Sequence, residues 1–140
     1  MNKLISSSPL FQNEALALFR IIIGIFLIYH GQEIFDHNKI EEYSKWEVIQ
    51  KMPSPLFMAY LGKGMELITG IFLTLGLFTR IASLCMAITM LFIVFIIGSG
   101  KFYLDDQHPF LFALIGILFF FTGPVKWSID KKLFKEKRYR

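Results

Sequence analysis

The sequence predicts an all-α protein, an integral membrane four-helix bundle with an additional interfacial amphipathic helix between its first two spans. Three observations lead to this prediction. Hydrophobic residues make up 54% of the 140 residues and charged residues only 19%, whereas soluble domains are usually about 25% charged. The apolar residues gather into four segments, each near the roughly 20 residues that a helix needs to cross a bilayer. Most charges lie between these segments or after the last one.

The four apolar segments define the expected spans in chain order. They run over residues 15–35, 56–77, 80–98 and 109–127, within a single membrane domain that covers residues 1–140. Only a short turn separates the second span from the third, so we expect these two helices to form a tight antiparallel hairpin.

The connection between the first two spans has a pattern of its own. Ile40, Tyr43, Trp46 and Ile49 recur at intervals of three residues, with Lys and Glu between them. We expect an amphipathic helix at about residues 38–51 that lies among the lipid headgroups, with the two aromatic residues as interface anchors. An ordinary solvated loop helix is the alternative interpretation.

The distribution of basic residues predicts the orientation in the membrane. Seven of the fifteen Lys and Arg residues follow residue 125, and most of these belong to a tail at residues 128–140. Because basic flanks prefer the cytosolic side and an even number of spans places both ends together, we expect both termini in the cytosol. A basic tail directly after an apolar helix favours contact with the lipid bilayer, and we expect no nucleic-acid partner.

Ionisable residues inside the spans are informative because each costs about 2.5–3.5 kcal/mol at the centre of a membrane helix. Glu66 lies near the middle of the second span, and Lys63 lies about one turn away, at a spacing that permits a direct pair. The first span places His30 and Glu33 near the height of Lys63. Arg20 lies in the inner third of that span, nearer the cytosolic end, and we expect its guanidinium to reach toward Glu66.

Two interpretations of these residues stay open. In the first, the charged side chains form internal ion pairs that fix the register of the bundle. In the second, they line a small polar cavity that binds a ligand head group or carries protons. The candidates for ligand binding or proton relay are Arg20, His30, Glu33, Lys63 and Glu66.

Small residues predict where helices approach one another closely. Glycine on a helix face lets a second backbone come near, which is how many membrane helices associate. The candidate packing positions are Gly24, Gly31, Gly70 and Gly76.

Several kinds of site find no support in the sequence. The one cysteine, Cys85, cannot form an intramolecular disulfide or a cysteine-based metal cage. The histidines do not have the HxxH or HxxxH spacing that is typical of metal ligands, and we expect no metal site. No constellation supports nucleophilic catalysis, so no catalytic residue is assigned.

Three stretches resemble the DoxX family of small bacterial membrane proteins: RIIIGIFLIYHGQEIF, ELITGIFLTLGLFTRIASL and GPVKWSID. The resemblance covers nearly the whole chain, in order and at matching spacing. Two positions depart from the family pattern: Ile34 stands where a lysine is frequent, and Val125 stands where glycine usually follows proline. The matching positions are Arg20, Gly24, His30, Gly31, Glu66, Gly70, Leu73, Gly76, Arg80, Gly123, Pro124, Ser128 and Asp130.

The resemblance implies a four-helix bundle in a bacterial cytoplasmic (inner) membrane. Some relatives are subunits of quinone-linked enzymes, so it also implies an accessory or quinone-interacting subunit of a membrane redox system, with quinone as the cofactor and a membrane-protein subunit or a second copy of the chain as the partner. Two alternatives are a non-enzymatic assembly or scaffold subunit of a larger membrane complex, and a pathway for small solutes or protons. The carry-over of function rests on family analogy.

Overall fold

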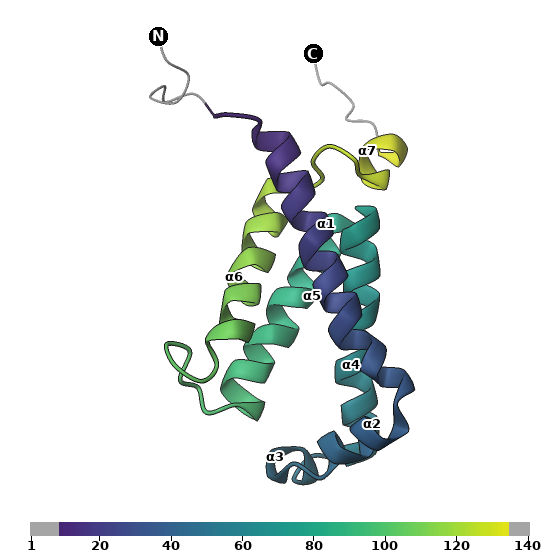
Figure 1. Ribbon diagram of the computed structural model, residues 1–140, viewed down its shortest axis with the longest axis vertical. Helices are drawn as coiled ribbons and strands as arrows, with labels where there is room; N and C mark the ends of the chain where they lie inside the picture. The colour runs from purple at the N-terminus through teal and green to yellow at the C-terminus, as the bar shows by residue number, and fades with distance from the viewer. Residues whose placement is uncertain (1–8, 135–140) are drawn as a thin grey trace.

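The computed structural model describes residues 9–134 and is all-helical over that part of the chain. Four long apolar helices form the body, and shorter helices cover its two ends (Figure 1). The long helices are α1 (Gln12–Gly31), α4 (Pro55–Leu75), α5 (Thr79–Phe92) and α6 (Gln107–Thr122). The shorter elements are the 3₁₀ helix η2 (Gln32–Phe35), α2 (His37–Ser44), α3 (Glu47–Gln50), the π-helix η3 (Ile93–Ile97) and α7 (Ile129–Leu133).

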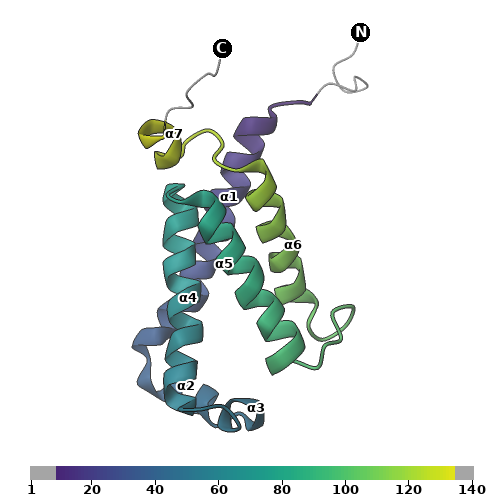
Figure 2. The same cartoon turned by 180° about the vertical axis from the view of Figure 1, so that it is seen from behind.

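The bundle has two distinct ends, which we name after the short helices found there. At the α2–α3 end, the chain leaves α1, folds back through α2 and α3, and enters α4; the loop between η3 and α6 lies at this same end (Figures 1 and 2). At the α7 end, the α4–α5 turn, the start of α1 and the end of α6 meet α7. The four long helices therefore run antiparallel to their neighbours along the chain.

Helix length and composition agree with a membrane bundle. Three helical segments are long and apolar enough to cross a membrane: Gln12–Phe35, Pro55–Leu75 and Thr79–Ile97. They coincide with the predicted spans 15–35, 56–77 and 80–98. Their outward faces expose many large apolar side chains, Phe26 and Ile88 among them. Such a surface would be costly in water and is the kind that lipid covers.

The core lies where the four helices face one another. Leu27 of α1, Leu73 of α4, Met86 of α5 and Phe119 of α6 are almost fully buried and belong to one contiguous apolar cluster. Each comes from a different long helix, so this cluster holds the bundle together along its axis.

The four predicted packing glycines lie at close contacts. A Cβ added to Gly31 would lie 2.3 Å from the backbone nitrogen of Leu67, and one added to Gly70 would lie 2.7 Å from the carbonyl oxygen of Gly24. A Cβ on Gly24 would lie 2.4 Å from the Thr74 hydroxyl. These glycines bring α1 and α4 into backbone contact at two heights, as small residues do in membrane helix pairs.

The α4–α5 turn depends on the fourth glycine and on the C-terminal segment. Gly76 has a φ of 65°, which a residue without Cβ adopts at little cost, and it ends α4. Asp130 then accepts hydrogen bonds from the backbone N–H groups of Phe78 and Thr79, each at 2.7 Å, and so caps α5. This cap attaches α7 to the start of α5.

Three boundaries differ from the sequence prediction. The predicted continuous helix at 38–51 is two helices, α2 and α3, because Trp46 has extended backbone angles between them. The predicted fourth span, 109–127, is shorter, because α6 ends where Gly123 turns to a φ of 66° ahead of Pro124. The predicted tail at 128–140 contains α7, whose neighbour Ser128 and member Asp130 are buried; residues 135–140 lie outside the described part.

The predicted interfacial helix also has its apolar side against protein. Ile40 is fully buried and Ile49 is 4% exposed, and both α2 and α3 pack on α4. Trp46 is 46% exposed. The apolar residues at 40 and 49 thus hold this connection onto the bundle, and its place among lipid headgroups stays a prediction.

Candidate functional site

A charged cluster lies at the α2–α3 end, and we define it as Glu33, Lys39, Tyr43, Lys63 and Glu66. The Lys63 Nζ atom lies 2.9 Å from a carboxylate oxygen of Glu33 and 3.1 Å from one of Glu66. The lysine therefore bridges two carboxylates that come from different helices. The side chains are largely enclosed: 16% exposed for Lys63, 21% for Glu33 and 9% for Glu66.

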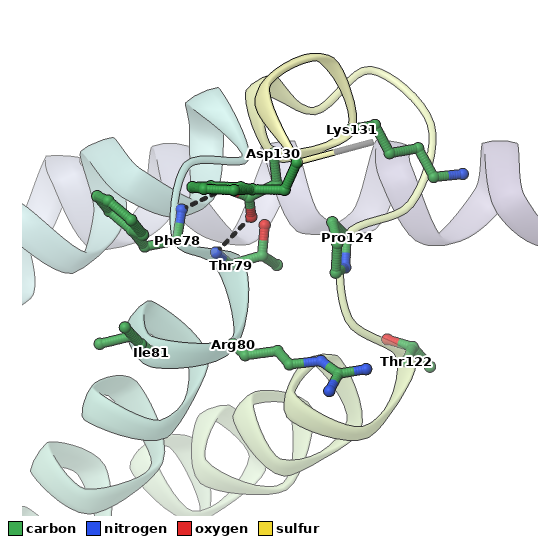
Figure 3. Close-up of a pocket in the computed structure, with 9 residues that line it drawn as sticks. Phe78, Thr79, Arg80, Ile81, Thr122, Pro124, Asp130 and Lys131 are labelled. Carbon is green, nitrogen blue, oxygen red and sulfur yellow. Dashed lines mark hydrogen bonds between the residues drawn. The ribbon is translucent and has the colours of Figure 1, made fainter. Parts of the chain in front are cut away.

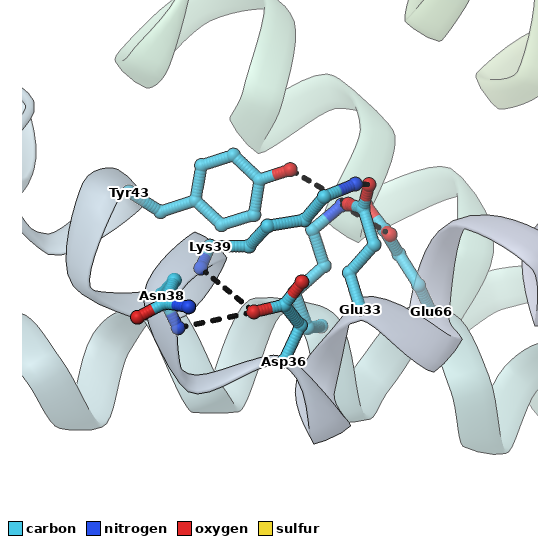
Figure 4. Close-up of polar contacts among 7 residues, drawn as sticks. Glu33, Asp36, Asn38, Lys39, Tyr43 and Glu66 are labelled. Carbon is cyan, nitrogen blue, oxygen red and sulfur yellow. Dashed lines mark hydrogen bonds and ion pairs between the residues drawn. The ribbon is translucent and has the colours of Figure 1, made fainter.

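The local sequence explains how these residues meet. Lys63 and Glu66 are three residues apart on α4, so they lie on the same side one turn apart. Gly31 lets α1 touch α4, and the 3₁₀ turn of η2 that follows directs Glu33 to Lys63. Asp36 then caps α2 by accepting from the backbone N–H groups of residues 38 and 39, which turns the chain back over the cluster (Figure 4).

Helix α2 supplies the remaining two members. The Tyr43 hydroxyl donates to Glu33 at 2.6 Å, and its ring lies 5.0 Å from the Lys63 ammonium, within the range of a cation–π contact. Lys39 donates to the other oxygen of Glu33. Glu33 thus accepts from three side chains and is the best-connected member of the cluster (Figure 4).

The contacts shift the pKa values of the two members on α2. Burial raises the pKa of Tyr43 far above its usual value near 10, and its hydrogen bond to Glu33 adds to the rise. The hydrogen bond to Glu33 likewise raises the pKa of Lys39. At neutral pH the tyrosine is a hydrogen-bond donor and the lysine is a cation.

A cavity of about 490 Å³ opens beside this cluster, and we call it the α4–α5 cavity. Lys63, Glu66 and Tyr43 form one edge of it, and Thr89 adds a hydroxyl from α5. The rest of the lining is almost entirely apolar and comes from α3, α4, α5, η3 and the connection after α3: Trp46, Ile49, Met52, Met58, Ala59, Leu61, Gly62, Met65, Ile88, Phe92, Ile93 and Ile97. A mainly apolar pocket with a few convergent polar groups is the usual form of a small-molecule site.

The π-helix η3 forms part of the cavity wall. Ile93 and Ile97, at its two ends, both line the cavity. A π-helical turn widens the helix by one residue, and such turns occur frequently at functional sites. Here the change from α5 to η3 shapes the apolar wall opposite Lys63 and Glu66.

Arg20 lies apart from the cluster, and the expectation that it reaches Glu66 is wrong. It is completely buried near the α7 end, where its Nη2 donates to the carbonyl oxygen of Trp127 at 2.7 Å. A Cβ on Gly76 would lie 2.5 Å from its Nη1. Asp130 supplies the nearby negative charge. The guanidinium therefore turns toward the segment after α6, which the sequence analysis divided between the end of the fourth span and the tail.

His30 also lies outside the cluster. Its ring packs edge-on against the rings of Tyr29 and His108, with the centroids 5.8 and 6.0 Å apart. Among the described residues, no group of three or more His, Cys, Asp or Glu side chains is placed to hold a metal ion. The absence of a metal site stays a prediction from the sequence.

Two members of the cluster were missed by the sequence analysis. It assigned Tyr43 to the lipid interface and gave Lys39 no role. The signal that points to them is the pattern around Ile40: a buried position at 40 places residue 43 on nearly the same side of α2, toward the bundle. Lys39 lies beside that side and is long enough to reach Glu33.

Comparisons with known proteins agree with this architecture. The family model described as DoxX matches residues 15–99, which include all five members of the cluster. The chain is 28% identical to a Bacillus subtilis protein named "Putative oxidoreductase CatD" over 122 residues, 86% of this chain and 88% of that protein. It is 27% identical to a Haemophilus influenzae protein named "Uncharacterized protein" over 143 residues, 97% of this chain and 100% of that protein. No solved structure matches.

Proposed function

We propose that this chain, which belongs to the DoxX family, is a membrane-embedded subunit of a redox system and binds the head group of a quinone in the α4–α5 cavity. One observation carries the proposal: the cavity is apolar except for a few polar groups, and Lys63, Glu66 and Tyr43 of the charged cluster converge at one edge of it. A quinone has the complementary shape, with an apolar body and carbonyl oxygens that accept hydrogen bonds.

The polar edge has the groups that such a head group needs. The Lys63 ammonium is a charged donor in the lining, and Thr89 adds a hydroxyl from α5. The carboxylate of Glu66 is the group at this edge that can take up or release a proton. Lys63 and Thr89 would orient a carbonyl oxygen, and Glu66 would exchange the proton that accompanies reduction or oxidation of the quinone.

A redox partner is part of the proposal. With one cysteine, the chain cannot supply the four thiolates that hold a typical iron–sulfur cluster. The electrons would come from another subunit, and the chain would provide the quinone site. The name of the Bacillus subtilis relative, "Putative oxidoreductase CatD", supports a redox setting and says nothing of the ligand.

The membrane placement follows from the same helices and from the charge pattern. The protein is a membrane protein of the DoxX family, and we place it in a bacterial cytoplasmic membrane as a multi-pass protein, with α6 as the short fourth span. Outside the spans, the termini and the α4–α5 turn hold nine Lys and Arg residues of the sequence (Lys3, Arg80 and the seven after residue 125), against four in the two connections at the α2–α3 end (Lys39, Lys45, Lys51 and Lys101). By the preference of basic flanks for the cytosol, the α7 end and both termini face the cytosol, and the α4–α5 cavity lies in the outer half.

Quenching of tryptophan fluorescence tests the proposal directly. The chain has two tryptophans: Trp46 lines the cavity, and Trp127 lies at the α7 end. A Trp127→Phe variant in nanodiscs leaves one reporter beside the site, and a short-chain ubiquinone or menaquinone is titrated against it. We expect saturable quenching that Lys63→Met weakens by about tenfold, because this variant lacks the charge-assisted hydrogen bond that the ammonium would donate to a quinone carbonyl.

The matched control is Lys51→Met, which removes an ammonium that is 71% exposed and pairs with Glu47 outside the cavity lining. It should leave the quenching curve unchanged. Quenching that never saturates, or that is the same in wild type and Lys63→Met while both remain folded, would refute quinone binding here. Co-purification of envelope proteins without quinone would then favour the scaffold interpretation.

A further inference from the structure

A second pocket lies at the α7 end, far from the charged cluster, and nothing in the proposed function uses it. It has a volume of about 760 Å³ and lies between the start of α5 and the segment from the end of α6 to α7 (Figure 3). We call it the α7 pocket. Arg80 and Lys131 are its two cationic lining residues, and Asp130 is its one carboxylate among the described residues.

The carboxylate of Asp130 is already engaged by the backbone. Its two oxygens accept from two backbone N–H groups at the start of α5, each at 2.7 Å. By contrast, neither Arg80 nor Lys131 has a carboxylate within 4.0 Å in the part of the chain that the structure describes. The pocket therefore carries excess positive charge.

The Arg80 side chain packs against the backbone of Gly123 at the edge of the pocket. A Cβ at Gly123 would lie 2.9 Å from the Arg80 Nε atom, so the guanidinium lies directly against this glycine. Figure 3 shows Arg80 extending from α5 toward Thr122 and Pro124, while Lys131 comes from α7. The buried Thr79, whose hydroxyl has no hydrogen-bond partner within the described residues, is also part of the lining. Two cations from separate elements thus border one space.

The remaining walls are apolar and open outward. Phe78, Ile81 and Phe134 line the pocket and are 45%, 62% and 61% exposed. A group that fits this combination carries a compact negative charge for Arg80 and Lys131 and an apolar portion for these walls. Guanidinium and ammonium groups both bind phosphate oxygens well.

We propose that the α7 pocket binds a phosphate group, held by Arg80 and Lys131, and that the exposed apolar walls favour a phospholipid as its source. This inference is independent of the quinone proposal, because the two pockets lie at opposite ends of the bundle and share no residue. It places an anionic headgroup on the side that the basic residues assign to the cytosol.

The test measures binding by the full chain in maltoside micelles. Phosphatidylglycerol is titrated in, with phosphatidylcholine for comparison, and the bound lipid is counted by native mass spectrometry. We expect the Arg80→Gln/Lys131→Gln variant to bind phosphatidylglycerol at least about tenfold more weakly than wild type. The matched control, Lys126→Gln/Lys132→Gln, removes two charges from the same end but from outside the lining, and should change binding less than twofold.

The source of the phosphate is decided by a parallel arm with inorganic phosphate and glycerol 3-phosphate. If wild type binds these soluble ions and the Arg80/Lys131 variant does not, the site is kept and its ligand is a soluble phosphate compound. If wild type binds phosphatidylglycerol alone, the ligand is a lipid. Equal loss in the control, or no loss in the pocket variant, overturns the proposal. If the double variant fails to fold, Thr122→Glu places a carboxylate in the pocket wall and should abolish binding; unchanged binding would overturn the proposal equally.

Discussion

Substituting Lys63 by methionine tests whether one shared cation holds the charged cluster together. In the wild type its ammonium pairs with Glu33 at 2.9 Å and Glu66 at 3.1 Å. Methionine keeps most of the side-chain volume and removes the charge. Glu33 then retains Lys39 and Tyr43, whereas Glu66 has no other ion-pair or hydrogen-bond partner in the described residues and is 9% exposed. The cost of the substitution therefore falls mainly on Glu66.

The magnitude follows from two limits. Removing one partner of a buried ion pair usually costs about 3–5 kcal/mol. A carboxylate can escape that cost by taking up a proton, and at pH 7 this costs an ordinary glutamate about 4 kcal/mol. We therefore expect Lys63→Met to lower the free energy of unfolding by about 2–4 kcal/mol at pH 7. Each unit of lower pH reduces the free-energy cost of protonating the carboxylate by about 1.4 kcal/mol. The loss in the free energy of unfolding should therefore fall to about 1 kcal/mol at pH 5.

The assay is unfolding in mixed detergent micelles with rising dodecyl sulfate, followed by far-ultraviolet circular dichroism at pH 7 and pH 5. Lys51→Met is the control, because its partner Glu47 is 85% exposed, and it should cost less than about 1 kcal/mol at either pH. The double variant Lys63→Met/Glu66→Met removes both charges and should recover at least about 1 kcal/mol relative to Lys63→Met alone. A loss that does not depend on pH, or strict additivity in the double variant, would refute the reasoning.

Three other predictions concern packing, the α7 end and alkaline pH. Gly31→Ala puts a Cβ 2.3 Å from the α4 backbone and should lower the thermal midpoint, at a cost of about 1–3 kcal/mol, whereas Gly62→Ala meets nothing within 4 Å and should cause no loss. Asp130→Ala removes both acceptors of the α5 cap and should destabilise by about 1–2 kcal/mol; an unchanged midpoint would contradict this. Burial raises the pKa of Tyr43, so the unfolded chain loses the phenolic proton at a lower pH than the folded protein does. The free energy of unfolding should therefore fall above about pH 10, and Tyr43→Phe should make this fall smaller.

Hydropathy and spacing were sufficient to predict the long helices and the ion pair within α4. Each apolar run is long enough that only a helix satisfies its backbone in lipid, so the type of element follows from length alone. The pair of Lys63 and Glu66 needs only the geometry of one helix, in which residues three apart are neighbours. Both predictions depend on local information.

The break between α2 and α3 illustrates how a correct pattern led to an incorrect helix. A residue spacing of three lags the helical turn by about 60° at each step, so after three steps Ile49 would face away from Ile40 in a continuous α-helix. The structure buries both, at 4% and 0% exposure, because extended backbone at Trp46 resets the direction of the chain. A period of three over nine residues was therefore evidence for an interruption.

The partner of Arg20 could not be predicted because it lies 107 residues away in the chain. The sequence places charges at heights along a span but does not say how the segment after the last span folds. Here Asp130 turns back to cap α5, and that docking brings the Trp127 carbonyl and a carboxylate to the buried guanidinium. The guanidinium that looked free to join Glu66 instead donates through Nη2 to Trp127, at the end of the predicted fourth span, while its Nε and Nη1 atoms have no hydrogen-bond partner in the described residues.

The two ends of the bundle show that a buried charge is not sufficient to mark a binding site. Arg20 is more deeply buried than Lys63 or Glu66, yet it faces backbone, glycine and a compensating carboxylate, and it lines neither of the two pockets. Removing its side chain would therefore lower the stability of the fold. Lys63 and Glu66 pair with each other and also border a cavity of about 490 Å³ whose other walls are apolar. Of these three buried charged residues, only Lys63 and Glu66 can exchange hydrogen bonds or a proton with a bound molecule, so the cavity, rather than the cost of burying the charge, separates the functional candidates from the structural ones.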